Sequence, residues 1–398
     1  MYVDCGTLYT GTSVVEDGRF TVSDGRIEAV GTQESVAGEG ERLDLSTEIV
    51  APGFIDAHLH LKGARSMDPM AWVTGTTSED AARAVADAES LLDAGFTTVR
   101  DVGSDVAIGV RNAIDGGEIA GPRVFTSGRS ISQTGGHGDM HMFPREWVTD
   151  GAGISTLADG ADECRRVARE RHRDGADLLK IMTTGGVLSE KDDPNEPQFT
   201  DEEVTALVEE AHRVGMPVAS HAQGSEGIKR ALKNGVDTIE HGFHVDDETV
   251  DLMLETDATF VPTLAIMHRI LAEGESHGVP EHGLRKARAA SEAHYESVKR
   301  AKAAGVEIAA GTDFIGPELI PHGENALELE LLVTEADFTP AEAIAAATVT
   351  AGRTVPDDVG GLATGNHADF ITLGSDPATA IEAVYDVECV YKGGERVR

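Results

Sequence analysis

The stretch Gly53-Phe54-Ile55-Asp56-Ala57-His58-Leu59-His60 joins a short apolar run to two histidines that are two positions apart. A run of this length with large apolar side chains predicts a buried β-strand. On a strand, residues i and i+2 point to the same side, so we expect both imidazoles to face one space. Two neutral imidazoles at this spacing suit a divalent metal ion, but two structural histidines fit the same short pattern.

Outward from this stretch, short β-branched runs alternate with longer amphipathic segments, which is the pattern of βα units and a parallel sheet. We predict eight strands, at Gly53–His60, Thr97–Val102, Arg123–Ser130, Asp177–Thr183, Pro217–His221, Thr238–His241, Thr259–Leu264 and Glu307–Thr312. Periodic helices lie between them, including Ser78–Ala94, with Ser78 as its N-cap and Gly95 after its end, and Thr200–Val214. Eight strand–helix repeats over about 250 to 300 residues predict an α/β fold, a (β/α)8 TIM barrel at residues 53–355.

The two ends of the chain have a different pattern. Residues 1–52 and 356–398 contain short alternating runs separated by turn signals such as Asp17-Gly18 and Gly393-Gly394. Neither end is long enough for an independent β domain. We therefore predict one small β-sandwich that is built from both termini and lies beside the barrel.

The composition is strongly acidic, with 70 Asp and Glu against 33 Lys and Arg and a formal net charge of −37. Phosphate binding needs a basic face, so this balance argues against nucleic acid as a partner. Only nine of the 33 basic residues are lysines. Dense carboxylates with few lysines resemble the surfaces of proteins from salt-loving organisms, and we expect stability to require salt.

Other features of the sequence concern its location. No apolar run approaches the roughly 20 residues that span a bilayer, and the start lacks a signal peptide, so we expect a cytoplasmic protein that does not bind membranes.

The three cysteines, Cys5, Cys164 and Cys389, are far apart and odd in number. They predict ordinary buried thiols and no disulfide framework.

Further candidate metal ligands follow the later strands. His221, His241 and Asp313 each stand at the end of a predicted strand, and in a TIM barrel these ends converge on one mouth. Lys180 lies within an apolar strand, where a charged ammonium is costly. It is either a lysine that extends from a strand end to solvent or a lysine carbamylated by CO2, whose oxygens would bridge two metal ions.

These motifs together resemble the amidohydrolase superfamily, and within it the imidazolonepropionase-related branch that contains metal-dependent Xaa-Pro and other Xaa dipeptidases. The resemblance covers essentially the whole chain. It is carried by six segments: Ala51-Pro52-Gly53-Phe54-Ile55-Asp56, Ser132-Gln133-Thr134-Gly135-Gly136-His137-Gly138-Asp139, Lys180-Ile181-Met182-Thr183-Thr184-Gly185-Gly186-Val187, Ile239-Glu240-His241-Gly242, Gly311-Thr312-Asp313 and Pro321-His322-Gly323-Glu324-Asn325-Ala326-Leu327-Glu328-Leu329.

The resemblance implies two divalent metal ions, with zinc as the expected metal. One zinc would be bound by His58, His60, Asp313 and carbamylated Lys180, and the other by Lys180, His221 and His241. Asp313 would also take a proton from the water that becomes the metal-bridging hydroxide, and pass this proton to the leaving amine.

The resemblance also suggests substrate contacts. His137 would reach the substrate carbonyl or carboxylate, although an exposed loop histidine fits the sequence equally well, and His322 has the same ambiguity. Gln223 stands where some prolidase-like members carry an aromatic hydroxyl, and its amide can donate hydrogen bonds to a carboxylate. The remaining histidines, among them His141, are expected at the surface or in the core. Arg65, Arg129 and Arg145 are specificity candidates by position only.

We therefore predict a binuclear metal-dependent amidohydrolase that cleaves a dipeptide, Xaa-Pro or related, or an N-acyl amino acid. Gly224 stands where deaminases of the superfamily carry a glutamate, which argues against deamination. The alternative is a cyclic amidohydrolase of the imidazolonepropionase type, which uses one metal ion. A third hypothesis is a barrel without activity that binds a ligand. The resemblance makes a homo-oligomer reasonable.

Overall fold

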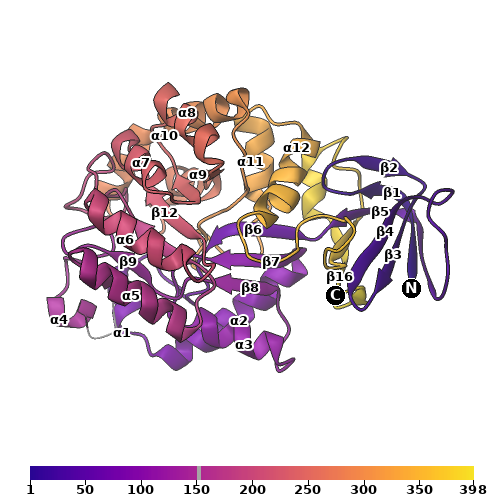
Figure 1. Cartoon of the computed structure of the whole chain (residues 1–398), viewed down its shortest axis with the longest axis horizontal. Helices are drawn as coiled ribbons and strands as arrows, with labels where there is room; N and C mark the ends of the chain where they lie inside the picture. Colours follow the sequence, from indigo (N-terminus) through magenta and orange to yellow (C-terminus); the bar gives the residue numbers. More distant parts are fainter. Residues whose placement is uncertain (150–153) are drawn as a thin grey trace.

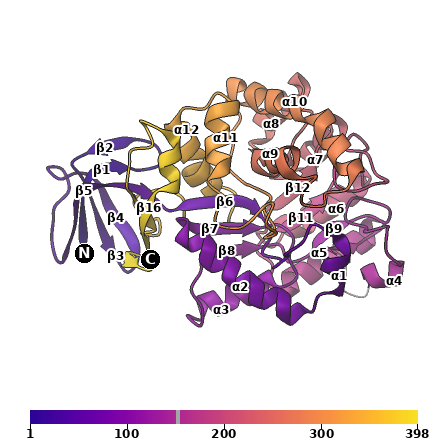
Figure 2. The same cartoon turned by 180° about the vertical axis from the view of Figure 1, so that it is seen from behind.

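One sheet of the protein contains strands from both ends of the chain. The computed structural model describes residues 1–149 and 154–398. The sheet has eight strands in the order β17-β16-β15-β5-β1-β3-β4, with β2 paired to β1. Its strands are β1 (Tyr2–Tyr9), β2 (Val14–Glu16), β3 (Gly18–Ser23), β4 (Arg26–Thr32), β5 (Arg42–Pro52), β15 (Phe370–Leu373), β16 (Val387–Lys392) and β17 (Glu395–Arg396). Figures 1 and 2 show both termini at this sheet, beside the larger helical part. The domain boundaries at residues 52 and 356 stay a prediction.

Aromatic side chains fill the core of this terminal sheet. Phe370 of β15 stacks on Tyr391 of β16 with ring centroids 4.3 Å apart, and its edge meets Phe20 of β3 at 5.1 Å. Val3 and Val50 are fully buried in the same cluster. The N-terminal and C-terminal strands therefore share one apolar core, which neither set forms alone.

The larger part contains two parallel sheets, with strand orders β6-β7-β8 and β10-β9-β11-β12-β13-β14. The strands are β6 (Phe54–Leu59), β7 (Phe96–Asp101), β8 (Arg123–Thr126), β9 (Ser130–Ser132), β10 (Ser155–Leu157), β11 (Leu179–Met182), β12 (Val218–Ala222), β13 (Thr238–His241) and β14 (Thr259–Val261). The predicted single strand Arg123–Ser130 is wrong, because Gly128 turns the chain with φ +58° between β8 and β9. The predicted strand from Thr259 ends early, since Thr263 adopts φ +56°.

The segment Glu307–Thr312 is not a regular strand, which corrects a prediction. It forms an isolated bridge between Ile308 and Phe260 of β14. On its other side the Ala57 amide donates to the Ala310 carbonyl at 2.9 Å. The middle of the segment, residues 309–311, consists of small residues. Alanine and glycine favour a regular β-ladder less than β-branched residues do. The observed fold is mixed α/β, with this extended segment between β14 and β6.

Helices connect the strands and cover them. They are α1 (Pro69–Thr74), α2 (Thr77–Asp93), α3 (Ala107–Asp115), α4 (Arg145–Trp147), α5 (Ala161–Asp174), α6 (Asp201–His212), α7 (Ser225–Lys233), α8 (Asp247–Thr256), α9 (Leu264–Glu273), α10 (Glu281–Ala304), α11 (Leu327–Glu335) and α12 (Pro340–Ala345). The predicted N-cap Ser78 is wrong, because Thr76 is the N-cap. The Thr76 hydroxyl accepts from the Glu79 amide, and the Thr76 amide donates to the Glu79 carboxylate. Gly95 follows the helix with φ +85°, as predicted.

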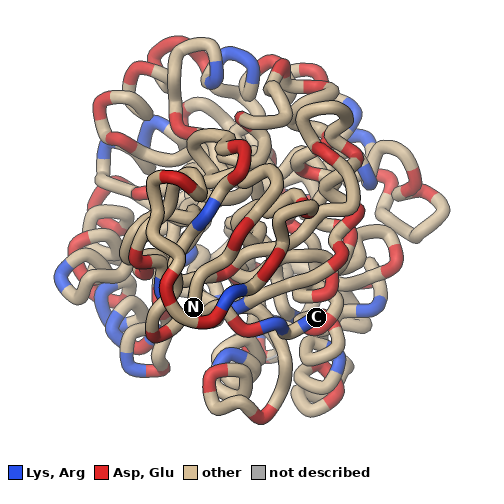
Figure 3. The backbone as a smooth tube through the Cα atoms, turned by 90° about the vertical axis from the view of Figure 1, so that its right-hand side faces the viewer, with Lys and Arg blue, Asp and Glu red and all other residues tan. Residues whose placement is uncertain are grey.

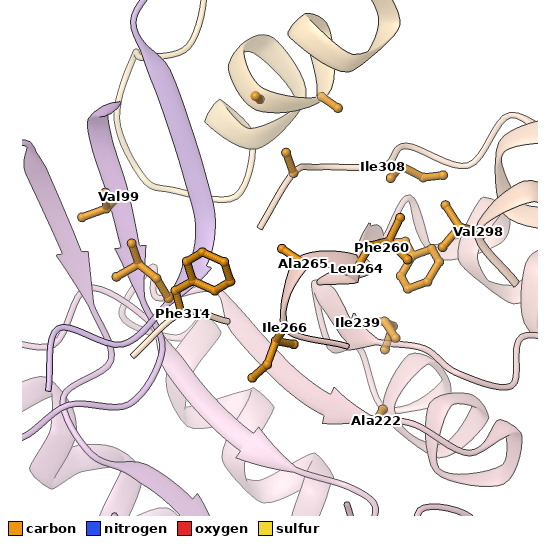
Figure 4. Close-up of a cluster of buried hydrophobic side chains, with 14 of the residues drawn as sticks. Val99, Ala222, Ile239, Phe260, Leu264, Ala265, Ile266, Val298, Ile308 and Phe314 are labelled. Carbon is orange, nitrogen blue, oxygen red and sulfur yellow. The ribbon is translucent and has the colours of Figure 1, made fainter. Parts of the chain in front are cut away.

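A buried cluster fixes the ends of β12 and β13 against α9. Ile239, Phe260 and Leu264 are fully buried in it, together with Ala222 (Figure 4). Gly242 follows β13 with φ +53°, and a Cβ atom there would lie 2.4 Å from the Phe260 ring. Only glycine allows the chain to leave β13 this close to the core.

Charged residues are spread over the chain, and Figure 3 shows Asp and Glu on many separate segments. Cys5 and Cys164 are buried, Cys389 is half-buried, and all three are free. Among the helices of the described residues, none has the length and apolar character needed to cross a membrane.

Candidate active site

One cavity of about 190 Å³ brings the six predicted metal ligands together. His58 and His60 lie at the end of β6 and just after it, and His221 and His241 come from β12 and β13. The other two lining residues are Lys180 of β11 and Asp313. Parallel strands end at the same edge of their sheet, so side chains distant in sequence meet there.

His58, His60 and Asp313 form a compact group that is able to bind a metal ion. Asp313 Oδ1 lies 3.1 Å from His60 Nε2 and 3.5 Å from His58 Nε2. The three ligand atoms lie within 4.8 Å of one another. His60 Nδ1 donates to the Gly103 carbonyl at 3.2 Å, which turns its other ring nitrogen toward Asp313. Asp313 has φ +59°, a rarely populated conformation that directs its carboxylate into the cavity.

His221 and His241 form the second group of ring nitrogens. Their ring centroids are 4.6 Å apart, and His241 lies 4.9 Å from His58. His221 Nε2 donates to the Gly185 carbonyl at 3.1 Å, and His241 Nδ1 lies 2.8 Å from the Thr263 hydroxyl. Within the described residues, no hydrogen bond involves the second nitrogen of either ring. Burial lowers the pKa of both imidazoles, which favours the neutral form that binds metals.

Lys180 is a buried lysine in this cavity. Burial lowers its pKa to about 8, although the charges of Glu240 and Asp313 oppose the change. A lowered pKa increases the fraction of neutral amine, the form that reacts with CO2. Four imidazoles, one carboxylate and an amine that can be carbamylated are a donor set that fits divalent metal ions.

Comparison with known proteins identifies the family. The profile of the Amidohydrolase family matches residues 49–397. The chain belongs to the amidohydrolase family. Like its relatives, this amidohydrolase is a hydrolase that acts on carbon–nitrogen bonds.

Three relatives are similar to this amidohydrolase in sequence or in structure. Ochratoxinase from Aspergillus niger is 33% identical over 417 residues, which cover 98% of this chain and 85% of that protein. The crystal structure of A. niger ochratoxinase matches with a TM-score of 0.92, 32% identity and coverage of 100% and 95%. A crystal structure of a Xaa-Pro dipeptidase with bound methionine in its active site has 33% identity, a TM-score of 0.87 and coverage of 100% and 99%. Imidazolonepropionase from Salinispora tropica is 24% identical over 402 residues, which cover 92% of this chain and 90% of that protein.

Behind His58 lies a buried ion pair that sequence reasoning missed. Glu240 Oε2 accepts from His58 Nδ1 at 2.6 Å, and Glu240 Oε1 lies 2.7 Å from Arg100 Nη2. Both charged side chains are fully buried. Burial opposes ionisation of Glu240, but the charges of Arg100 and His58 hold its pKa well below the usual range. The signal in the sequence was a charged residue inside each of two apolar strands.

A second buried carboxylate ties β6 to the Asp313 segment. Asp56 accepts from the His58 amide at 2.9 Å, the Thr312 hydroxyl at 2.7 Å and the Asn325 side chain at 2.7 Å. These bonds fix the relative position of His58 and Asp313. Asn325 belongs to the motif at residues 321–329, in which the sequence predicted a role only for His322.

The predicted substrate contacts lie in different places. His137 lines the cavity, stacks on His221 with centroids 4.3 Å apart and donates from Nδ1 to Asp192 at 3.0 Å. Gln223 lines the cavity too, and its buried Oε1 accepts no hydrogen bond from the described residues. His322 is instead buried behind His60, where its Nε2 donates to the His60 carbonyl at 3.1 Å.

Apolar side chains form the walls of the cavity above the histidines. They come from several separate segments and include Met67, Trp72, Met140, Met142, Leu188 and Met267. His141 also lines the cavity, although we expected it at the surface or in the core. Within the described ranges the lining contains none of the arginine candidates, and Arg65 instead pairs with Asp87 at 2.8 Å. Lys62 lines the cavity but lies 2.9 Å from Asp105, so its charge is balanced.

Proposed function

We propose that this amidohydrolase is a binuclear metal enzyme that hydrolyses the amide bond of a dipeptide, Xaa-Pro or related, or of an N-acyl amino acid. The observation that supports it most is the shared cavity, where the His58, His60 and Asp313 group lies beside Lys180, His221 and His241. We also propose that the segment between β14 and β6 completes a (β/α)8 arrangement, since it hydrogen-bonds to both neighbours.

The residues divide into two metal sites that share one ligand. His58, His60 and Asp313 would hold one ion and His221 and His241 the other, with carbamylated Lys180 between them. Zinc suits these ligands. When bound, the metal ions would supply Lewis-acid activation of water and of the substrate carbonyl.

The side chains of the chain perform the remaining steps. Asp313 would accept a proton from the attacking water and donate it to the leaving amine, because its carboxylate reaches into the cavity beside the ligand histidines. With a proton on each ring nitrogen, His137 would donate from Nδ1 to Asp192 and from Nε2 to the substrate carbonyl or carboxylate. Gln223 would contact the polar end of the substrate, since its amide lines the cavity with Oε1 lacking a partner.

The cavity walls suggest which substrates to test first. Methionine and tryptophan side chains suit an apolar group of variable shape. The dipeptidase structure with bound methionine is consistent with an apolar amino acid in this place. Cyclic amides of the imidazolonepropionase type remain the second candidate, supported by the distant relative. The buried Lys180 favours the two-metal enzyme over this alternative. A homo-oligomer, a cytoplasmic location and an origin in a salt-loving organism remain predictions.

The test is amine release from a library of dipeptides and N-acyl amino acids, in molar potassium chloride with zinc and bicarbonate. Asp313→Asn should abolish turnover while the fold is retained. Asp139→Asn is the matched control, because Asp139 is a cavity carboxylate outside the proposed ligand set that accepts from the Gly135 amide at 2.8 Å. Silence of the wild type toward the library, with two metals bound, would redirect the search to cyclic amides. Activity of Asp313→Asn near the wild-type level would refute the proposed role of Asp313.

A further inference from the structure

A loop after β11 lies against the cavity and contacts His137. Residues 185–198 carry Val187 and Leu188 into the cavity lining and bring Asp192 to the His137 ring. We propose that Lys286 of α10 and Asp192 are positioning residues that hold His137 in the orientation needed to bind substrate. The substrate contact of His137 rests on the proposed function, whereas the orientation of the ring rests on the contacts of Asp192 and Lys286.

Lys286 fixes the backbone of this loop. Its ammonium donates to the carbonyls of Gly186 at 3.1 Å, Ser189 at 2.7 Å and Asp192 at 2.5 Å. A lysine ammonium has three donors, so all of them are used on one loop. On the same helix His282 Nε2 donates to the Leu188 carbonyl at 3.1 Å. The first turns of α10 thus hold four carbonyls of the loop in place.

Asp192 connects this loop to the His137 ring through hydrogen bonds. Its Oδ2 accepts from His137 Nδ1 at 3.0 Å and from the Gly186 amide at 3.1 Å. Lys286 Nζ lies 3.7 Å from Asp192 Oδ1, close enough to balance the buried charge. A carboxylate that accepts from one imidazole nitrogen fixes the ring and leaves the other nitrogen for a ligand.

The His137 ring also has close neighbours apart from Asp192. One face stacks on His221 at an interplanar angle of 20°. Against the ring lies Gly186, where a Cβ atom would be 2.1 Å from His137 Cε1. The His137 amide donates to Gln198 Oε1 at 2.9 Å, which ties its backbone to the end of the loop. The ring therefore has one position as long as the loop keeps its place.

The activity test is a double-mutant cycle between positions 137 and 192. Asp192→Asn and His137→Gln should each lower kcat/KM tenfold or more, with metal content and thermal unfolding as in the wild type. Added to His137→Gln, Asp192→Asn should cause no further loss, because a positioning residue acts only through the ring that it orients. Additive losses, or loss of metal from Asp192→Asn, would overturn the proposal.

Lys286→Met tests the helix contact, with Lys299→Met as the matched control. Lys299 lies on the same helix and pairs only with Glu296, at 3.6 Å, among the contacts of the described chain. Lys286→Met should lower kcat/KM and speed amide hydrogen exchange in residues 185–192, whereas Lys299→Met should change neither. Gly186→Ala places a methyl group against the ring and should lower kcat/KM as Asp192→Asn does. Exchange and kcat/KM that stay at the wild-type level in Lys286→Met would contradict the role of Lys286.

Proton nuclear magnetic resonance tests the orientation of His137 independently of the hydrolytic activity. A hydrogen-bonded imidazole N–H gives a downfield proton resonance, and the one from His137 should disappear in His137→Gln. In Asp192→Asn it should move upfield, because an amide oxygen is a weaker acceptor than a carboxylate. This result is expected even if the wild type hydrolyses no member of the library, which would refute the proposed function alone. A resonance that disappears in His137→Gln but keeps its wild-type chemical shift in Asp192→Asn would overturn the positioning role.

Discussion

Replacing Glu240 by Gln removes one charge from a buried pair while keeping the size of the side chain. Arg100 Nη2 lies 2.7 Å from Glu240 Oε1, and water reaches neither side chain. Leaving one charge of such a pair without its partner costs about 3 to 5 kcal/mol. We therefore expect Glu240→Gln to lower the free energy of unfolding by roughly this amount.

The same substitution changes the partner of His58. In the wild type Glu240 Oε2 accepts from His58 Nδ1 at 2.6 Å, so Nε2 of this ring is the nitrogen available to a metal ion. A glutamine amide that donates at this point would make Nδ1 an acceptor and place the ring proton on Nε2. Loss of an outer partner of a metal-binding histidine lowers metal affinity about 10- to 100-fold, and we expect a change in this range.

Denaturant unfolding and chelator competition with zinc measure the two effects separately. Arg123→Met is the control. Arg123 of β8 pairs through Nε with Oδ2 of Asp369, the residue before β15, at 2.9 Å, and neither residue lines the cavity. This control should lose stability and keep its metal affinity. If Glu240→Gln binds zinc as tightly as the wild type, the proposed orientation of His58 by Glu240 is refuted.

Three further outcomes are expected. Burial raises the pKa of Glu328 from 4.5 to about 8, where it accepts from the Leu264 and Ala265 amides at 3.0 and 2.7 Å. The folded state therefore keeps a proton that the unfolded state releases, so stability should fall as pH rises from about 4.5 to about 8, and Glu328→Gln should flatten this part of the curve of melting temperature against pH. Lys180→Ala should lose turnover, and short carboxylic acids should partly restore it by replacing the carbamate; unchanged metal content without rescue would count against a bridging lysine. Because the net charge is −37, the melting temperature should rise with potassium chloride up to molar concentrations, and full refolding without salt would contradict this.

The grouping of the candidate ligands in one cavity was predictable because it follows from strand geometry. The i, i+2 spacing places His58 and His60 together, and the ends of β12 and β13 bring His221 and His241 to the same edge. The sequence could not reveal which strand neighbour pairs with Glu240, since Arg100 is distant in the chain and the contact depends on sheet order. Loop contacts such as Asp192 with His137 have no periodic signal at all.

The predicted boundaries of helices and strands were wrong where two local sequence signals were nearly equivalent. Thr76 and Ser78 both stand at the start of the same helix, but only Thr76 stands three residues before Glu79 and completes a capping box. The segment from Glu307 to Thr312 was predicted as a strand from its position in the rhythm of the chain. Its small central residues leave it extended but irregular, so its role depends on its neighbours on both sides.

The terminal sheet has a consequence for synthesis of the protein. Strand β5 pairs with β1 on one side and with β15 on the other, and Pro52 lies opposite Phe370. During translation the first strands leave the ribosome long before β15 exists, so β5 waits with an open hydrogen-bonding edge and an incomplete apolar core. Strand β15 thus completes a sheet whose N-terminal strands precede it by more than 300 residues, and a nascent chain that stalls before residue 370 exposes an edge that can pair with other chains.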